Sequence, residues 1–465
     1  MRRTAVINVV GLSESLLGEN TPRLNTFRQK GSLCRIGPAF PAVTCTAQAT
    51  YLTGLTPAEH GIVANGWYDR ELAEVHFWKQ SNRLVHGKKL WESLRETDRK
   101  FTCAQLFWWY NMYSSADWSI TPRPMYPADG RKLFDIYAWP YQVRTEIKRE
   151  LGEFPFAGFW GPAAGVNSPQ GPPEVVSRWI AEAAKWIERK FSPSLNLIYL
   201  PHLDYNLQRR GPGHPSIGDD LRRIDSIVGD LMEFFQARSV QVIVLSEYGI
   251  SQVHSVVHPN RLFREQGWVA IKEELGRELL DYGASRVFAV ADHQVAHIYC
   301  KDPTLLSAVR SLLERQDGIA EVLTLEMMQE RGLNHARAGD LIAVANEGSW
   351  FSYYYWQDDA RAPDFARTVD IHRKPGYDPV ELFLDPEIPL VRAKIGWRLL
   401  QKRLGLRMLM DVIPLNAGLV KGSHGRRPRD VREWPVLITG RKELGTKSEV
   451  EAGEVFQLLR SHCGP

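Results

Sequence analysis

Thr44 is the residue whose surroundings in this 465-residue chain most clearly suggest chemistry. Pro38 and Pro41 favour an extended approach to it, and residues 44–53 (TCTAQATYLT) can form a short helix that stops at Gly54. The first turn of a helix attracts anions, because its N–H groups lack partners and the helix dipole points there. A hydroxyl at that place could attack a phosphorus centre while the backbone holds the phosphoryl oxygens. The alternative is that Thr44 only caps the helix.

The stretch from 40 to 69 contains a longer pattern around Thr44. An FP dipeptide precedes the threonine, a TG dipeptide ends the helix, and P-x-x-HGI-x-x-N-x-x-YD follows. This region resembles the nucleophile region of the nucleotide pyrophosphatase/phosphodiesterase (type I phosphodiesterase) family of the alkaline phosphatase superfamily. The resemblance implies an α/β fold, an alkaline-phosphatase-like three-layer sandwich with a mostly parallel central sheet and inserted cap regions. The matching residues are Phe40, Pro41, Thr44, Thr53, Gly54, Pro57, His60, Gly61, Ile62, Asn65, Tyr68 and Asp69.

The same resemblance implies roles for side chains. Thr44 would be the nucleophile, and Asn65 would help to hold a non-bridging phosphoryl oxygen, although an Asn that merely forms a turn is an equal alternative. Family members hold two divalent metals, usually zinc, through six further side chains. At those positions Asp204 and His424 match outright and Glu247 conservatively, whereas Val10, Gln208 and Tyr248 replace a ligand. The metal site is therefore expected to be degenerate, with one ion, most simply zinc, in place of two.

A second group of potential ligands lies in 358–379 (DDARAPDFARTVDIHRKPGYDP). In a strand, Asp370 and His372 would project to the same face and could hold a metal. Arg373 could bind phosphate together with Arg367 and Lys374. The alternative is a solvated, charged loop that happens to contain a histidine.

Three weaker candidates accompany these groups. His202, two residues before Asp204 in an extended segment, could replace the imidazole that the family has at position 208. The sequence ADHQVAH at 291–297 would align two histidines on a helix, but its neighbours favour strands, so core or surface histidines are expected. Cys45 has no visible base beside it and is expected to serve packing.

Strands alternate with helices in the pattern of a parallel sheet wrapped by helices. The segments 1–106, 174–260 and 386–465 are expected to form an alkaline-phosphatase-like core. The aromatic-rich segment 107–173 would be an insertion over the edge of the sheet, and 261–385 a cap or subdomain with the Asp/His-rich loop. The expected strands are 4–10, 102–107, 196–200, 240–245, 287–290, 297–300 and 341–344, and the expected helices are 21–30, 44–53, 87–95, 174–190, 217–238 and 390–410.

Bulk composition narrows the class of protein. A net charge of +4 gives no reason to expect a nucleic-acid partner, and five cysteines without C-x-x-C spacing fit a reducing compartment. No signal peptide or transmembrane segment is expected, so a cytoplasmic location is the default. The basic helix at 390–410 could touch an acidic partner or a lipid surface, but a solvated face is the simpler explanation.

The sequence therefore predicts a metal-dependent hydrolase of a small-molecule phosphate ester: a phosphodiester, a pyrophosphate or a monoester. The reaction would pass through a covalent Thr44 intermediate. The competing hypothesis is a catalytically silent scaffold that binds a phosphorylated or lipid-like metabolite as a biosynthetic accessory protein.

Overall fold

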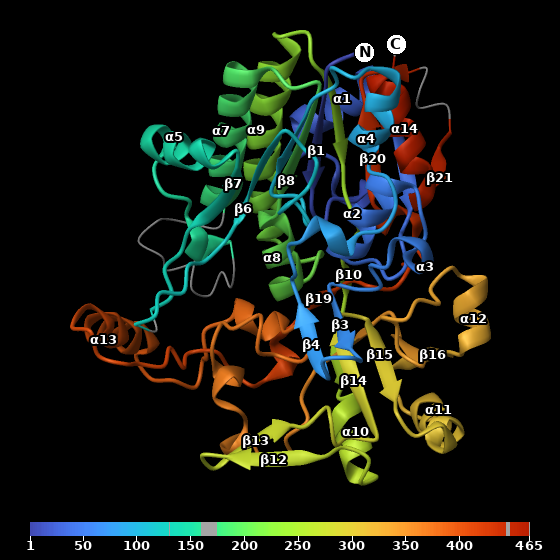
Figure 1. Ribbon diagram of the computed structural model, residues 1–465, viewed down its shortest axis with the longest axis vertical. Helices are drawn as coiled ribbons and strands as arrows, with labels where there is room; N and C mark the ends of the chain where they lie inside the picture. Colours follow the sequence, from blue (N-terminus) through green and yellow to red (C-terminus); the bar gives the residue numbers. More distant parts are fainter. Residues whose placement is uncertain (130, 160–173, 443–446, 465) are drawn as a thin grey trace.

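A large twisted sheet forms the upper part of the molecule in Figure 1, and a smaller sheet lies below it. The computed structural model describes residues 1–129, 131–159, 174–442 and 447–464. The large sheet has nine strands, and its five central strands β9-β1-β8-β5-β6 run parallel. In sheet order the strands are β21 (Glu449–Glu451), β2 (Ser32–Gly37), β20 (Val436–Thr439), β9 (Gln241–Leu245), β1 (Thr4–Val9), β8 (Leu195–Leu200), β5 (Cys103–Leu106), β6 (Trp118–Pro122) and β7 (Ile136–Trp139).

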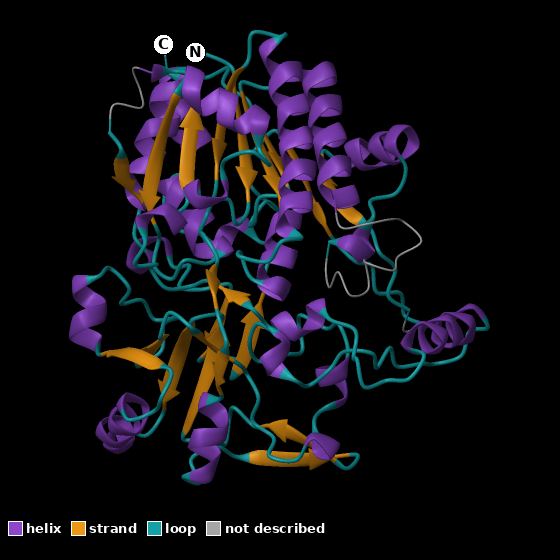
Figure 2. Ribbon diagram, turned by 180° about the vertical axis from the view of Figure 1, so that it is seen from behind, coloured by secondary structure: helices purple, strands orange, loops and turns teal. Residues whose placement is uncertain are grey.

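The central strands are near-continuous apolar runs because helices cover both faces of the sheet. All six residues of β1 and of β8 are buried. Figure 2 shows the helices standing on either side of the strands, which confirms the predicted three-layer α/β fold. One layer contains α7 (Glu174–Phe191), α9 (Ile217–Gln236) and α1 (Pro22–Lys30), and the other contains α2 (Thr44–Thr53), α4 (Leu90–Thr97) and α14 (Val455–Cys463).

The smaller sheet is antiparallel, with the order β14-β15-β17-β16, and has a hydrophobic core of its own. The aromatic run 353–356 (YYYW) is buried in that core, together with residues of the segment 412–420. The elements of this part are α10 (Pro259–Glu265), β12 (Ile271–Glu274), β13 (Arg277–Leu280), β14 (Val287–Asp292), β15 (Val295–Cys300), α11 (Leu306–Glu314), β16 (Ile319–Leu323), α12 (Leu325–Glu330), β17 (Leu341–Ala345) and β18 (Ser349–Phe351).

Two segments bear on the predicted domain division, whose boundaries stay a prediction. Strands β6 and β7 both come from the aromatic-rich segment 107–173 and extend the edge of the large sheet; residues 160–173 lie outside the described part of the chain. The helix α13 (Val391–Arg403) projects to one side of the molecule in Figure 1. Its residues Val391 and Ile395 pack against the core of the smaller sheet, not against the large one.

The two sheets meet at the carboxyl ends of the central parallel strands, where open α/β sheets generally bind ligands. The short strands β10 (Ser251–Gln252) and β19 (Gly422–Ser423) pair there, and α8 (His202–Arg210) begins there directly after β8. None of the helices in the described segments combines the length and the apolar character that crossing a bilayer requires. The five cysteines are all buried free thiols.

Candidate active site

Thr44 is the first residue of α2, as predicted, and its side chain is only 3% exposed. Val43 before it is extended (φ −131°, ψ 155°), and Gly54 ends the helix in the left-handed region at φ 71°. A side chain at Gly54 would meet Phe456 of α14 at 3.1 Å, so glycine suits both the turn and the contact. The helix thus begins inside the protein and presents the Thr44 hydroxyl to a small buried cavity.

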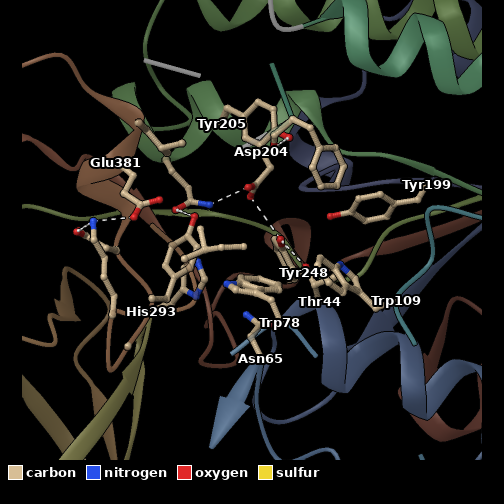
Figure 3. A pocket seen from close by; sticks show the side chains of 18 residues that line it. Thr44, Asn65, Trp78, Trp109, Tyr199, Asp204, Tyr205, Tyr248, His293 and Glu381 are labelled. Atoms are coloured by element: carbon tan, nitrogen blue, oxygen red, sulfur yellow. Dashed lines mark hydrogen bonds and ion pairs between the residues drawn. The ribbon is translucent and has the colours of Figure 1, made fainter. Parts of the chain in front are cut away.

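This cavity, called the Thr44 cavity below, has a volume of about 70 Å³. Figure 3 shows the side chains that converge on it from the large sheet and from the smaller one. Its lining residues are Thr44, Asn65, Trp78, Trp109, Phe159, Tyr199, Asp204, Tyr205, Gln208, Tyr248, His293, Ile371, Lys374, Gly376, Tyr377, Asp378, Glu381 and Leu382.

A chain of hydrogen bonds starts at the nucleophile candidate. The Thr44 hydroxyl lies 3.2 Å from the Tyr248 hydroxyl, which in turn donates to Asp204 Oδ1 at 3.4 Å. Gln208 Nε2 donates to the other oxygen of Asp204 at 2.7 Å. Figure 3 shows these contacts as dashed lines that run from Thr44 through Tyr248 to Asp204. The arrangement connects the Thr44 proton to a carboxyl group through one phenol.

Two buried carboxyl groups, Asp204 and Glu247, lie on this side of Thr44, and neither forms an ion pair within the described part of the chain. Burial raises the pKa of Asp204 to about 7, although Gln208 and Tyr248 partly offset this effect with hydrogen bonds. Burial raises the pKa of Glu247 to about 8, against hydrogen bonds from Gln48, Asn8 and Thr44. Asn8 Nδ2 donates to Glu247 Oε1 at 2.6 Å, and Gln48 Nε2 donates to the same oxygen. Protons, held by burial, therefore reduce the charge of both groups near neutral pH.

Four rings form a stacked column beside the cavity. Tyr248 lies face to face with His424 (centroids 3.6 Å apart, planes 7° apart), His424 lies 3.7 Å from His293, and His293 lies 3.8 Å from Tyr377. The Nδ1 atoms of the two histidines are 2.7 Å from the Ala42 carbonyl and 2.8 Å from Asp292, respectively. Burial lowers the pKa of both histidines well below the usual value, so both are neutral.

The predicted metal ligands are not gathered around one point. Asp204 lines the Thr44 cavity, whereas Glu247 and His424 are not among its lining residues. No group of three or more His, Cys, Asp or Glu side chains in the described residues is placed to hold a metal ion. Val10 is a fully buried apolar residue, and Tyr248 fills with its ring the space beside His424. The donors therefore do not fit the metal site of the family, and a single zinc ion here stays a prediction that the geometry does not support.

Asp370, His372 and Arg373 are placed differently from the prediction. Residues 371–373 form a turn and Asp370 precedes it in irregular structure, so the expected D-x-H face of a strand does not exist. All three line a second, larger cavity, while Ile371 between them lines both cavities. Arg373 is exposed and paired with Asp364 at 3.0 Å, so it does not reach Thr44. The Pro and Gly residues that follow, 375 and 376, favour such turns over a strand.

His202 also differs from the prediction. It is the first residue of α8 and not part of an extended segment, and its Nδ1 lies 2.8 Å from the Ser177 hydroxyl. Its side chain is buried and does not line the Thr44 cavity, so it does not replace an imidazole there. The strands predicted at 287–290 and 297–300 do form, as β14 and β15, and the turn between them at His293 (φ 59°) brings this histidine into the cavity wall.

Asn65 lies at the wall of the Thr44 cavity. Its Oδ1 accepts from the Cys45 N–H at 3.0 Å, and its Nδ2 donates to Asp292 Oδ1 at 3.1 Å. The amide therefore fixes the start of α2 to the β14–β15 turn, and one of its two N–H bonds stays available to a ligand.

Lys374 is the cationic residue of the cavity wall that sequence reasoning underrated. It is buried and bonded to Asp378 at 2.7 Å and to Glu381 at 2.6 Å. Burial opposes its charge, but the two acids outweigh this effect and raise its pKa. Trp109 belongs to the segment 107–173, which its aromatic residues set apart in the sequence, while no sequence pattern pointed to Tyr199 or Tyr205.

Comparisons with known proteins agree with this architecture. Structures similar in fold include murine ectonucleotide pyrophosphatase/phosphodiesterase 5, an inactive variant in complex with AMP (TM-score 0.58, 15% identity, 100% of this chain and 95% of that one). Phosphonoacetate hydrolase from Sinorhizobium meliloti 1021 in complex with phosphonoformate is another (TM-score 0.61, 13% identity, 100% and 96%). At these identities the likeness concerns the fold.

A sequence relative is an uncharacterized pyrophosphatase/phosphodiesterase of Schizosaccharomyces pombe, 26% identical over 220 residues. The match spans 46% of this chain and 37% of that relative, well under half of its length. The sequence model of the type I phosphodiesterase / nucleotide pyrophosphatase family matches residues 4–378, which include Thr44, Asn65, Asp204 and Glu247. The chain therefore belongs to the type I phosphodiesterase / nucleotide pyrophosphatase family.

Proposed function

We propose that this protein hydrolyses a small-molecule phosphate ester and that Thr44 is the nucleophile. Family membership supports the reaction class. The observation that carries the proposal is the Thr44 hydroxyl itself, which stands at the start of α2, lines the Thr44 cavity and is linked through Tyr248 to Asp204. The N-cap position of α2 is occupied by Val43, so Thr44 is not the capping residue, and its hydroxyl lies 3.2 Å from the Tyr248 hydroxyl.

The proposed reaction has two steps, each a displacement at phosphorus. The Thr44 oxygen forms a bond to phosphorus while the bond to the leaving oxygen breaks, and the Thr44 proton passes to Tyr248 as the Tyr248 proton passes to Asp204. The leaving alcohol takes a proton from solvent. Water then attacks the phosphothreonine and gives up a proton to solvent while the bond between Thr44 and phosphorus breaks. The Thr44 oxygen takes a proton from Tyr248 as Asp204 returns its proton to Tyr248, so phosphate or a phosphomonoester is released and all three residues are restored.

Three groups of this chain would hold the phosphoryl oxygens. The dipole and first-turn amides of α2 favour an anion beside Thr44. Asn65 offers an N–H bond from the adjacent wall, and Lys374 contributes a buried positive charge on the opposite side. Divalent metals generally supply charge neutralisation in this family, but the donors present here do not fit such a site, so the proposed steps use protein groups alone.

The replaced metal ligands also support the competing hypothesis of a catalytically silent scaffold, because an enzyme that loses metal ligands can become a binding protein. Val10, Gln208 and Tyr248 stand at three of the six family ligand positions. A binding protein would keep the cavity without turning a substrate over.

The test compares turnover of bis(4-nitrophenyl) phosphate and 4-nitrophenyl phosphate by the full chain with that of two matched variants. Thr44→Ala removes the nucleophile and should abolish hydrolysis. Thr46→Ala removes a hydroxyl of the same helix that bonds to the Ile62 carbonyl and does not line the cavity, and it should retain activity. Acid quenching during turnover should leave a phosphoryl group on the peptide that contains Thr44, detected by mass spectrometry. Equal activity of Thr44→Ala and the parent protein would refute the proposal, and no turnover by the parent would favour the scaffold.

A further inference from the structure

A second cavity adjoins the Thr44 cavity and is about ten times larger, with a volume of about 740 Å³ against about 70 Å³. Trp78, Trp109 and Ile371 line both, so the two cavities lie side by side at these residues. The Thr44 cavity is by far the smaller of the two and would hold the phosphoryl group beside the nucleophile. A substrate with a large substituent would therefore extend into the adjoining large cavity.

We propose that the large cavity binds a long hydrocarbon chain, so that the ester cleaved at Thr44 is an anionic amphiphile: a phosphate ester of a single apolar chain. The inference rests on the proposed function, since it takes Thr44 as the place of reaction, and it goes further by naming the class of substrate.

The lining of the large cavity has the chemistry of an acyl- or alkyl-chain site. One wall is made of aliphatic and thioether side chains from α13 and from the segment that follows it: Ile395, Leu399, Met408, Leu409, Met410 and Ile413. Aromatic side chains of Phe134 and Phe156 face them from the segments beside β7. Flexible, unbranched Met side chains adapt well to chains of varying shape. A nucleotide base would need fixed hydrogen-bonding partners along its edges, and this wall offers few.

The charges around the cavity select the sign of the amphiphile. Among the described residues that line the cavity, Asp370 is the single carboxylate. Five lining residues are cationic: Lys79, Arg123, Lys132, Arg373 and Lys402. The excess of positive charge next to an apolar interior complements a negatively charged headgroup with a hydrocarbon tail.

The outer surface of α13 matches this substrate class. The helix exposes large apolar side chains, among them Trp397 (58% exposed) and Leu400 (45% exposed). Exposed basic residues of the same helix, Arg392 and Arg403, accompany them. A helix of this composition suits an anionic lipid or micelle surface, where amphiphilic substrates reside. The backbone at Trp78, between the two cavities, is in the left-handed region (φ 59°), which bulky side chains rarely adopt and which concentrates at functional sites.

The experiment measures steady-state hydrolysis of alkyl 4-nitrophenyl phosphates with chains from methyl to dodecyl, each below its critical micelle concentration. Each added methylene should raise kcat/KM about fourfold until the cavity is filled. This factor corresponds to the free energy of about 0.8 kcal/mol that is gained when one methylene group moves from water into an apolar site. Hydrolysis with a kcat/KM that does not depend on chain length would overturn the inference and leave the proposed function standing.

Two neighbouring residues of α13 provide a matched pair of variants. Leu399 lines the cavity and is 47% exposed, whereas Leu400 is similarly exposed at 45% and does not line it. Leu399→Asp should lower kcat/KM for the decyl ester at least tenfold, and Leu400→Asp should leave the dependence on chain length as it is. Equal effects of the two substitutions would contradict the assigned wall, and equal thermal melting would show that both variants fold.

Direct binding separates failure of the chain site from failure of the catalytic proposal. Calorimetry compares dodecyl phosphate, ethyl phosphate and dodecyltrimethylammonium on the parent protein. Tighter binding of dodecyl phosphate than of both others supports the chain site even if no ester is hydrolysed, in which case only the proposed function fails. Equal binding of ethyl and dodecyl phosphate, or tighter binding of the cationic amphiphile, would overturn the inference.

Discussion

The Tyr248 hydroxyl is the only group that joins Thr44 to Asp204 in the hydrogen bonds described for these residues, so its removal tests the proposed proton path directly. Tyr248→Phe keeps the ring, and with it the face-to-face contact with His424 at 3.6 Å. The two hydrogen bonds lost are long, 3.2 and 3.4 Å, and each contributes about 0.5–1.5 kcal/mol to stability. We therefore expect unfolding in urea to become easier by about 1–2 kcal/mol, with the fold intact.

Catalysis should suffer far more than stability. Transfer of a proton by a positioned group accelerates a reaction by about 100- to 10,000-fold, which corresponds to about 3–5 kcal/mol of barrier. We expect kcat for a chromogenic phosphate ester to fall within that range in Tyr248→Phe. The matched control is Tyr205→Phe, because Tyr205 lines the same cavity but donates its proton to the Phe159 carbonyl at 2.7 Å. A Tyr248→Phe variant that keeps more than a tenth of the parental kcat, or a control that loses as much, would refute the relay.

Three further predictions follow from the structure. Dialysis against a chelator should change neither the melting temperature nor the turnover, because the donors in the described residues do not form a metal site. Elemental analysis that finds one bound metal ion per chain in the parent protein and none in Glu247→Gln would contradict this prediction. Lys374→Met should lower the free energy of unfolding in denaturant by about 3–5 kcal/mol, because it removes the cation that pairs with the buried Asp378 and Glu381. The control is Arg373→Met at the neighbouring exposed residue, which should lower the free energy of unfolding by at most about 1 kcal/mol. Burial lowers the pKa of His60 to about 3. Below pH 6.5 His60 therefore binds a proton in the unfolded chain but stays neutral in the folded one. The free energy of unfolding should fall on acidification by up to about 1.4 kcal/mol per pH unit because of this group. Unfolding measured from pH 7 to pH 4 should show a shallower slope in His60→Gln, and an identical slope would mean that the ring is accessible to protons when folded.

The parts that the sequence predicted well are those decided by local patterns. The helix 44–53 and its glycine stop were predicted within a residue, as were the buried strands at 4–9, 195–200 and 241–245, because apolar runs and turn residues specify them locally. Asp204 and Asn65 lie at the cavity for the same reason, since each follows a recognisable element.

The site around them could not be predicted in the same way. The position of the Tyr248 ring depends on His424, which is far away in the chain, and on the turn at His293 in the smaller sheet. Asp370 and His372 would share a face only in a strand, and the Pro and Gly residues at 375 and 376 favour a turn there instead. Each of the two cavities is lined by several segments that are far apart in the chain, and no single motif carries that information.

The column of four rings has a mechanical consequence. Tyr248 follows a strand of the large sheet, His424 follows β19, and His293 and Tyr377 come from the part built on the smaller sheet. A hinge that swung the two halves apart would have to unstack rings packed at 3.6–3.8 Å and break the Asn65 bridge to Asp292. These contacts hold the two halves together beside Thr44. We therefore expect a substrate to reach Thr44, and a product to leave it, through the large cavity that α13 borders.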